Sequence, residues 1–485
     1  LNIMYKMLDK KRLKSYFKEN RNRHIERIAE FIRQPTLPSE NEGVEETAEM
    51  VASYYRQLGC NEVELVPTKG YPGVWAYYDA GAPITIVNYC MFDTKPPDRS
   101  RWSIPPFEAK QTTLEPWGEV IIGCGARSRK GPYMTWLNAL EGIIKTEGTL
   151  PVNIMFLAEG EENQASPNYA QMVDKYRDRL KFATACFSPG ASEIDGVLNV
   201  WLGYKGLIFV KITASGSRWG RGPADRNAHG MSQVVVDSPS WHLIQILATF
   251  IEDEGRKVLI PGFYDQLTPP NNEEIEELRK FMKMKTGKKW QDVLKGVGGD
   301  VGDSSSELTE EEVYLKYFFY PSFNLNGLSA GFTGPGSPVF TLPGEAWALL
   351  DIRLPRGYKV DPVIEGIKTH LEKSGRNDID FEVIAAHNPL QANPNNDLLK
   401  VVRETSTEYN INIETEPYVA GGGPWSIFGN EFNMSVLFDV GIGHGGNAGA
   451  PDEYLVLNNT DRCHGLIESE MWYAEMIYNY AQDKS

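Results

Sequence analysis

Hydrophobic residues recur at two different spacings in the first part of the chain. Helical spacing predicts helices at about 11–34, 42–58, 133–145 and 166–179. Short apolar runs between them predict strands at 63–67, 74–78, 84–90, 120–123, 152–157 and 182–188. This alternation is typical of a parallel or mixed sheet that is covered by helices on both faces.

The spacing changes near Tyr204. Residues 206–214 (GLIFVKITA) alternate apolar and polar side chains, as an antiparallel strand with one exposed face does. The following pattern predicts helices at 241–252 and 362–373, strands at 346–354 and 381–385, and an exposed polar insertion at 280–311. After about residue 395 the first pattern returns, with helices at 398–409 and 467–481 and a strand at 435–440.

These patterns predict an α/β fold in which a smaller α/β lid domain is inserted into a larger domain built on a mixed sheet. We expect the larger domain to comprise residues 1–203 and 391–485, and the lid to comprise residues 204–390. Both parts have the length of ordinary domains.

Composition narrows the possible partners and the compartment. The 485 residues carry a formal net charge of -16, which argues against nucleic acid or an anionic membrane as the main partner. No apolar stretch approaches the roughly 18 residues of a membrane span, and the N-terminal residues lack the apolar core of a secretion signal. The five cysteines form no CxxC pair, so we expect free thiols and a cytoplasmic protein.

Acidic side chains follow one predicted buried strand. The stretch LAEGEENQASPN at 157–168 places Glu159, Glu161 and Glu162 where the apolar run VNIMFL ends. Ligands of open α/β sheets bind at the carboxyl ends of strands, and acids are costly to place there without a role. The stretch therefore predicts an active-site edge, with a solvated turn as the alternative.

Several loops together resemble the di-zinc amidohydrolases of the carnosine dipeptidase, aminoacylase and acetylornithine deacetylase family. NYCMFDTKP and WSIPPFEAK are similar to its His-x-Asp loop and the partner of that loop. GCGARSRKG, EGEENQASP and NAGAPDEYLVL are similar to further motifs of the site, and LDIRLPRGYKVDP to a lid signature. The resemblance implies a zinc-peptidase-like catalytic domain, a dimerisation lid and a homodimer.

The resemblance also implies a pair of divalent ions, but this sequence departs from the family at every ligand position. The five positions are occupied by Met91, Ser128, Asn163, Pro189 (or Ser188) and Gly449. Zinc requires imidazole, thiolate or carboxylate ligands, and a dinuclear site requires a bridging group. We therefore expect no metal and no other cofactor.

Other functional positions of the family are retained. Asp93 matches the aspartate that orients the first histidine ligand, and Glu162 matches the general base. His229 in AHG corresponds to the histidine that reaches a partner subunit's site and stabilises an oxyanion. Arg353 in DIRLP corresponds to a lid arginine with a structural or carboxylate-binding role.

Basic residues lie next to the lost bridging position. Loss of two cations would leave Asp93 and Glu162 uncompensated, and we expect Arg127, Arg129 or Lys130 to supply part of the missing charge. The alternative is that these side chains point to solvent. Arg129, Lys130 and, from the glycine-rich loop GIGHGGNAG, His444 are further candidates for binding substrate.

Cys124 is a possible nucleophile if these cations lower its pKa, but a buried structural thiol is the simpler interpretation.

Two hypotheses of function follow, with a third as the conservative alternative. The first is a metal-independent hydrolase or lyase that cleaves an amide-like bond in a small amino-acid-type substrate, with Glu162 and Asp93 as the acids and His229 as the oxyanion donor. The second is an inactive homologue that serves in binding, regulation or assembly. The third is an ordinary metallodipeptidase whose ligands are displaced to other acids: Glu193, Asp195, Asp225 and Asp452.

Overall fold

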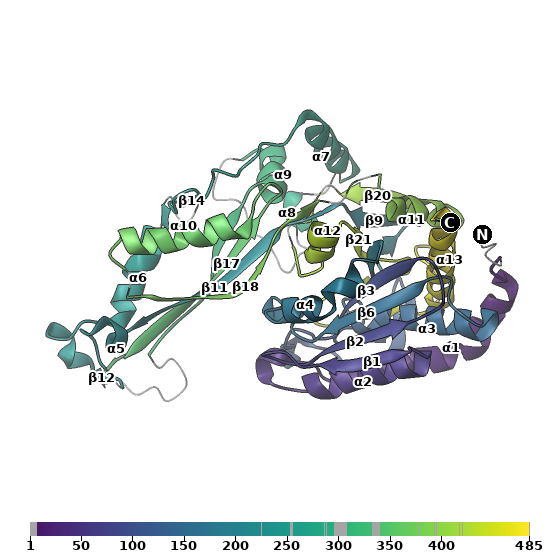
Figure 1. The fold of residues 1–485 in the computed structure, drawn as a ribbon, viewed down its shortest axis with the longest axis horizontal. Coiled ribbons are helices and arrows are strands. Elements are labelled where there is room, and N and C mark those ends of the chain that lie inside the picture. Colours follow the sequence, from purple (N-terminus) through teal and green to yellow (C-terminus); the bar gives the residue numbers. More distant parts are fainter. Residues whose placement is uncertain are drawn as a thin grey trace.

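The computed structural model describes residues 7–224, 226–252, 256–285, 287, 289–294, 308–331, 340–376, 378–391, 393, 395–416, 418–419 and 421–484. Figure 1 shows two bodies, a larger one that holds both ends of the chain and a lid that extends away from it. None of the helices in these ranges is long and apolar enough to cross a membrane.

The larger body is built on a six-stranded mixed sheet. Its strands in spatial order are β1 (Glu62–Val66), β2 (Gly73–Tyr78), β6 (Asn153–Glu159), β3 (Thr85–Met91), β7 (Ala185–Pro189) and β21 (Ser435–Val440). The last four run parallel to one another, and β1 and β2 are antiparallel to their neighbours. The parallel strands therefore end at one edge of the sheet.

Helices cover both faces of this sheet, as the alternation predicted. They are α1 (Lys10–Arg33), α2 (Val44–Leu58), α3 (Lys130–Glu147), α4 (Tyr169–Leu180), α11 (Asp397–Thr407), α12 (Ser426–Phe432) and α13 (Leu466–Asp483). Along β6, Ile154 and Phe156 join the core formed with α1, α2, α3 and α13, while Met155 and Leu157 pack on the opposite side with α4 and α12. Burial on both faces explains why these strands are continuous apolar runs.

Three smaller sheets flank the large one. The first sheet contains β4 (Lys110–Leu114), β5 (Gly118–Ile122), β22 (Gly445–Gly446) and β23 (Tyr454–Val456). The second contains β8 (Glu193–Ile194), β9 (Val197–Trp201) and β20 (Asn412–Glu416). The third pairs β10 (Gly203–Tyr204) with β19 (Leu390–Gln391). The predicted strand at 120–123 thus belongs to an antiparallel sheet that joins the GCGARSRKG loop to the C-terminal NAGAPDEYLVL segment.

The lid is a four-stranded antiparallel sheet with helices on one face (Figure 1). Its strands are β15 (Ser322–Ala330), β17 (Glu345–Leu354), β11 (Gly206–Ser215) and β18 (Asp380–His387), and its covering helices are α6 (Pro239–Thr249) and α10 (Val360–Lys373). Alternate residues of β11, among them Ile208, Val210 and Ile212, are buried against these helices. The predicted half-exposed strand at 206–214 is confirmed. Shorter elements complete the lid: α5 (Gly216–Trp219), β12 (Ala228–His229), β13 (Ile251–Glu252), β14 (Lys257–Val258) and β16 (Thr341–Leu342).

The segment predicted as a polar insertion contains more structure than expected. Helices α7 (Asn272–Met284), α8 (Trp290–Leu294) and α9 (Glu310–Phe319) lie in and around it. Phe281, Tyr314 and Phe318 form an apolar cluster between them. The interpretation of this part as an exposed insertion was therefore wrong for its described ends, while residues 295–307 lie outside the described ranges.

Candidate functional site

The parallel strands β3 and β6 bring two predicted acids together. Met91 at the end of β3 is paired with Glu159 at the end of β6, and Asp93 and Glu162 lie just beyond. The fully buried carboxylate of Asp93 accepts hydrogen bonds from the backbone N–H of Glu162 (3.1 Å) and of Asn163 (2.8 Å), and from the Asn163 side-chain amide (3.0 Å). Burial, reinforced by the nearby Glu162 charge, raises the pKa of Asp93 to about 6.

A cation lies directly against Glu162. The Arg129 Nη2 donates to Glu162 Oε2 at 3.0 Å, and both side chains are more than four-fifths buried. Burial opposes the charge on Arg129, but the carboxylates of Glu162 and Asp93 outweigh it and raise the Arg129 pKa. Of the three basic residues considered for this pairing, Arg129 makes a direct ion pair with Glu162.

The other two basic residues of the loop face elsewhere. Arg127 makes two parallel 2.9 Å hydrogen bonds to Asp439 on β21. Lys130 is fully buried and donates to the Gln34 carbonyl and to the Thr36 hydroxyl, and burial lowers its pKa to about 7. The ammonium group of Lys130 is thus bound by a loop of the larger body, and Lys130 does not line the cavities described below.

Glu453 fixes the shape of the same loop, although its role was not predicted from the sequence. Its buried carboxylate accepts hydrogen bonds from the backbone N–H groups of Gly125 (2.9 Å), Arg127 (2.9 Å) and Ser128 (2.6 Å). The signal that would have identified it is its position in the NAGAPDEYLVL segment, which β23 places beside this loop.

Another acid of this region is Glu159, the last residue of β6. It accepts from the Tyr89 hydroxyl (2.7 Å) and the Ser166 hydroxyl (2.8 Å), and burial raises its pKa well above the usual range. Burial therefore favours the neutral form of this carboxyl group.

The family's metal-ligand positions do not provide a zinc site in this chain. Met91 packs in the apolar core, and the amide of Asn163 is bonded to Asp93. Met91, Ser128 and Pro189 line a cavity of about 10 Å³, which is close to the space of a single water molecule. Among the residues that the structure describes, no three His, Cys, Asp or Glu side chains are grouped as metal ligands.

The acids considered as displaced ligands are engaged elsewhere. Glu193 accepts from the Gly443 N–H and is paired with His464 (2.9 Å), and Asp195 is paired with Arg462 (2.7 Å). Asp452 accepts from the Ser103 N–H, and Asp225 lies outside the described residues. Thioether, hydroxyl and amide groups are poor zinc ligands, so the side chains present do not fit a zinc pair.

A cleft opens beside the Arg129–Glu162 pair. A cavity of about 470 Å³ lies between the larger body and the lid, and Arg129, Glu162 and Trp425 face it from one side and Asp351 and Arg353 from the other. Arg353 donates to the Asp351 carboxylate (2.8 Å). A second cavity of about 300 Å³ adjoins it and extends toward the loop after Asp93.

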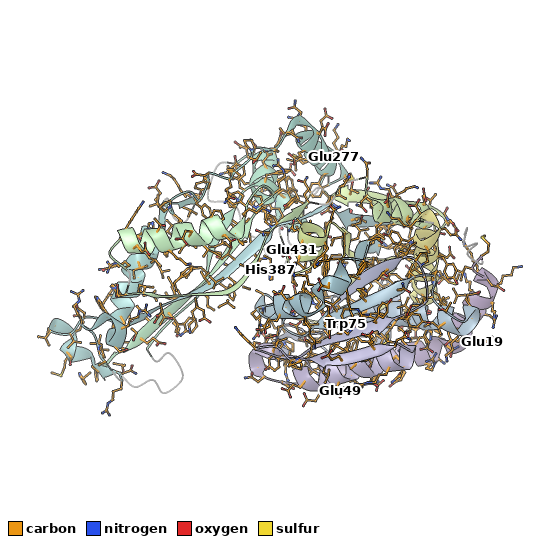
Figure 2. The ribbon with its side chains drawn as sticks, viewed as in Figure 1. Glu19, Glu49, Trp75, Glu277, His387 and Glu431 are labelled. Atoms are coloured by element: carbon orange, nitrogen blue, oxygen red, sulfur yellow. The ribbon has the colours of Figure 1, made fainter. Side chains whose placement is uncertain are left out.

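The three histidines near functional motifs have different surroundings. His387 at the end of β18, labelled in Figure 2 where the lid meets the larger body, is bonded through Nε2 to the Ala165 carbonyl (3.0 Å), next to the Glu162 turn. His444 is stacked on Trp117, and burial lowers its pKa to about 4. Neither cavity is lined by His444.

His229 lies on the lid, away from this cleft. Its exposed ring is beside Phe340, and its Nδ1 accepts from the Met231 N–H (3.2 Å). Within one chain His229 therefore does not line the cleft, so the predicted oxyanion role depends on a second subunit. Cys124 is buried, and burial raises its pKa to about 11, which fits a structural thiol.

Known proteins resemble the chain over most of its length. The human Beta-Ala-His dipeptidase is 26% identical over 293 residues, which cover 59% of this chain and 53% of the human protein. The chain thus spans about half the length of that relative. The Cys-Gly metallodipeptidase DUG1 of Candida albicans is 23% identical over 493 residues, covering 95% of this chain and 97% of that protein.

Solved structures give the same result for the fold. The M20 family metallo-carboxypeptidase Sso-CP2 of Sulfolobus solfataricus is similar with a TM-score of 0.77 and 27% identity, over 95% of this chain and 99% of that chain. Dug1p of Saccharomyces cerevisiae has a TM-score of 0.76 at 19% identity, over 98% of this chain and 99% of that chain. The sequence model of peptidase family M20/M25/M40 matches residues 92–469. The chain belongs to this peptidase family.

Proposed function

We propose that this member of the M20 peptidase family is a metal-independent hydrolase that cleaves an amide-like bond in a small amino-acid-type substrate. The observation that carries the proposal is the Arg129–Glu162 pair at the edge of the large cavity. It combines a fixed positive charge with the carboxylate at the family's general-base position. A low-dielectric site strengthens both effects.

The two side chains divide the chemistry between them. The guanidinium of Arg129 polarises the substrate carbonyl and stabilises the negative charge that develops on its oxygen. Glu162 takes a proton from a water molecule as that water attacks the carbonyl carbon, and then donates the proton to the departing nitrogen. Asp93 acts indirectly, since its hydrogen bonds to the backbone of Glu162 and Asn163 hold the turn in place.

Arg353 on the lid is suited to a carboxylate of the substrate. Its guanidinium lines the cavity opposite Arg129 and keeps unshared N–H groups beyond its contact with Asp351. The His387 hydrogen bond to Ala165 links the lid sheet to the Glu162 turn. This contact supports a closed arrangement in which lid and larger body share one substrate.

Assembly as a homodimer through the lid is part of the proposal. Apolar side chains with high exposure follow His229 in the chain or, in the case of Phe340, contact its ring: Met231 (74%), Val234 (84%), Val235 (84%), Trp241 (60%) and Phe340 (70%). A second copy would cover this surface and could carry its His229 toward the cleft. We also propose a cytoplasmic location, which the five free cysteines support.

A binding protein without catalysis is the second candidate. The same ion pair favours it, because one carboxylate oxygen of Glu162 already accepts from Arg129. The carboxylate of Asp93 is likewise occupied by its hydrogen bonds to Asn163. Both candidates predict a ligand in the cleft. They differ in whether Glu162 is needed for turnover or only for binding.

Comparison of Glu162→Gln with Glu161→Gln decides between them. Glu161 is the adjacent acid, is bonded to Asn168 and does not line the large cavity, so it is a matched control. Dipeptides and N-acyl amino acids are screened with the parent protein, and the best substrate is then measured with both variants. We expect a loss of about 10²–10⁴ in kcat for Glu162→Gln alone. Equal activity of the two variants would exclude Glu162 as the base.

A further inference from the structure

Two cavities meet at the candidate site and share part of their walls. Lys95, Arg129 and Asn163 line both the cavity of about 470 Å³ and the cavity of about 300 Å³. The Arg129–Glu162 pair therefore lies between two chambers rather than at the end of one. A substrate whose reacting bond lies at this pair has room on either side of it.

The acids of the two chambers are already engaged. Glu162 is paired with Arg129, and Asp351 with Arg353. Asp98 accepts from the backbone N–H (3.1 Å) and hydroxyl (2.6 Å) of Ser100, which lower the pKa of its carboxyl group, and the charge of Arg101 lowers it further. In the smaller chamber Glu453 accepts from the three amides of the 125–128 loop.

Unlike the two acids that form ion pairs, two cations of the smaller chamber, Lys95 and Arg101, have no ion-pair partner within the described ranges. Both side chains are exposed. With Arg129, which lines the same chamber, these two cations outnumber the carboxylates of Asp98 and Glu453, and this balance of charge makes the chamber a place for an anion. A chamber with an excess of cations is unusual for this protein, because the chain as a whole carries a net charge of -16.

Gly449 and Lys95 both line the smaller chamber. A Cβ added at Gly449 would lie 4.0 Å from the Cδ of Lys95, so the lysine stem passes close to this position. Gly449 has φ +67, a conformation that larger residues rarely adopt. Glycine is therefore suited to the backbone turn at this position, while the distance of 4.0 Å to Lys95 is an ordinary van der Waals contact.

We infer that the substrate carries a second anionic group, a carboxylate, which binds in the smaller chamber between Lys95 and Arg101. The inference rests on the proposed function and names its substrate class: an amide with a carboxylate on each side of the scissile bond. Arg353 faces one carboxylate across the large chamber, Lys95 and Arg101 face the other, and Arg129 and Glu162 face the amide.

Two ligands of equal length test this assignment. N-glutaryl-alanine and N-pentanoyl-alanine differ only in the terminal carboxylate of the acyl chain. Binding is measured by calorimetry with the Glu162→Gln protein, so that the result does not depend on turnover. We expect about tenfold or tighter binding of the glutaryl compound, since a charge-assisted contact contributes at least this much.

Variants of the residues that line the smaller chamber test whether the tighter binding of the glutaryl compound arises there. Lys95→Gln combined with Arg101→Gln is expected to abolish the preference, and both residues are exposed, so the fold should tolerate the change. Arg99→Gln is the matched control, because Arg99 is an exposed cation of the same short helix that lines neither cavity. Equal affinities, no binding of either ligand, or a preference that survives the double variant would overturn the inference.

Cleavage assays keep the two proposals distinguishable. Cleavage of both compounds by the parent protein with no preference would leave the proposed hydrolase intact and refute the second carboxylate site. Preferential binding of the glutaryl compound without cleavage would support the carboxylate site and refute the hydrolase.

Discussion

Replacing Arg129 by methionine is the most direct perturbation of the site's electrostatics. The change removes the only ion-pair partner that the described residues provide for Glu162, whose side chain is 16% exposed, and it removes a cation that acts on the fully buried Asp93. Removing one partner of a buried ion pair typically costs about 3–5 kcal/mol, because the remaining charge is left uncompensated. We expect about 3 kcal/mol here, since Glu162 keeps partial contact with solvent.

Urea unfolding at pH 7 measures this cost. The double variant Arg129→Met/Glu162→Gln is expected to recover part of the loss, because it no longer leaves the Glu162 charge uncompensated, and the double-mutant cycle gives the coupling of the pair. Arg177→Met is the control: Arg177 pairs with Glu431, which is labelled in Figure 2, and both side chains are about 40% exposed, so the loss should be at most about 1 kcal/mol. A loss for Arg129→Met no larger than that of the control would refute the reasoning.

The remaining predictions concern the supports of the site. The free energy of unfolding is expected to fall by up to about 3 kcal/mol as the pH rises from 4 to 6, because the pKa of Asp93 is higher in the folded protein and the stabilising proton is lost over this range. Urea titrations of the parent and of Asp93→Asn at several pH values check this. An identical pH dependence of the unfolding free energy in both proteins would contradict it. Glu453→Gln should destabilise the protein by about 3 kcal/mol, because the amide cannot accept from all three N–H groups of the loop. A thermal unfolding midpoint equal to that of the parent would exclude this role.

Much of the fold could be predicted from local patterns. Strand β11 and helix α10 have a period that matches their burial, and the buried parallel strands are uninterrupted apolar runs. Helices α7 and α9 were missed because their apolar residues are few and scattered among charges. A usable signal was present, since Asn271 and Thr309 each begin a capping box with a glutamate three residues on.

The site was predictable only in part. Arg129 was a candidate partner of Glu162 because the family resemblance places its loop beside the lost bridging position, but the choice among Arg127, Arg129 and Lys130 depends on tertiary contacts. Arg127 is occupied by Asp439, which lies 312 residues away in the chain and reaches it only because β21 pairs with β7. The partner of Lys130 is likewise a loop from a distant part of the chain. No local pattern contains that information.

One measurement tests the central claim most directly. The metal content and the amidase activity are determined on the same preparation, purified without chelator and again after chelator treatment. The account predicts that zinc and manganese are far below one ion per chain and that activity is unchanged by the chelator, because Arg129 and Glu162 carry the reaction. Two tightly bound ions per chain, with activity lost on their removal and restored on their return, would contradict it.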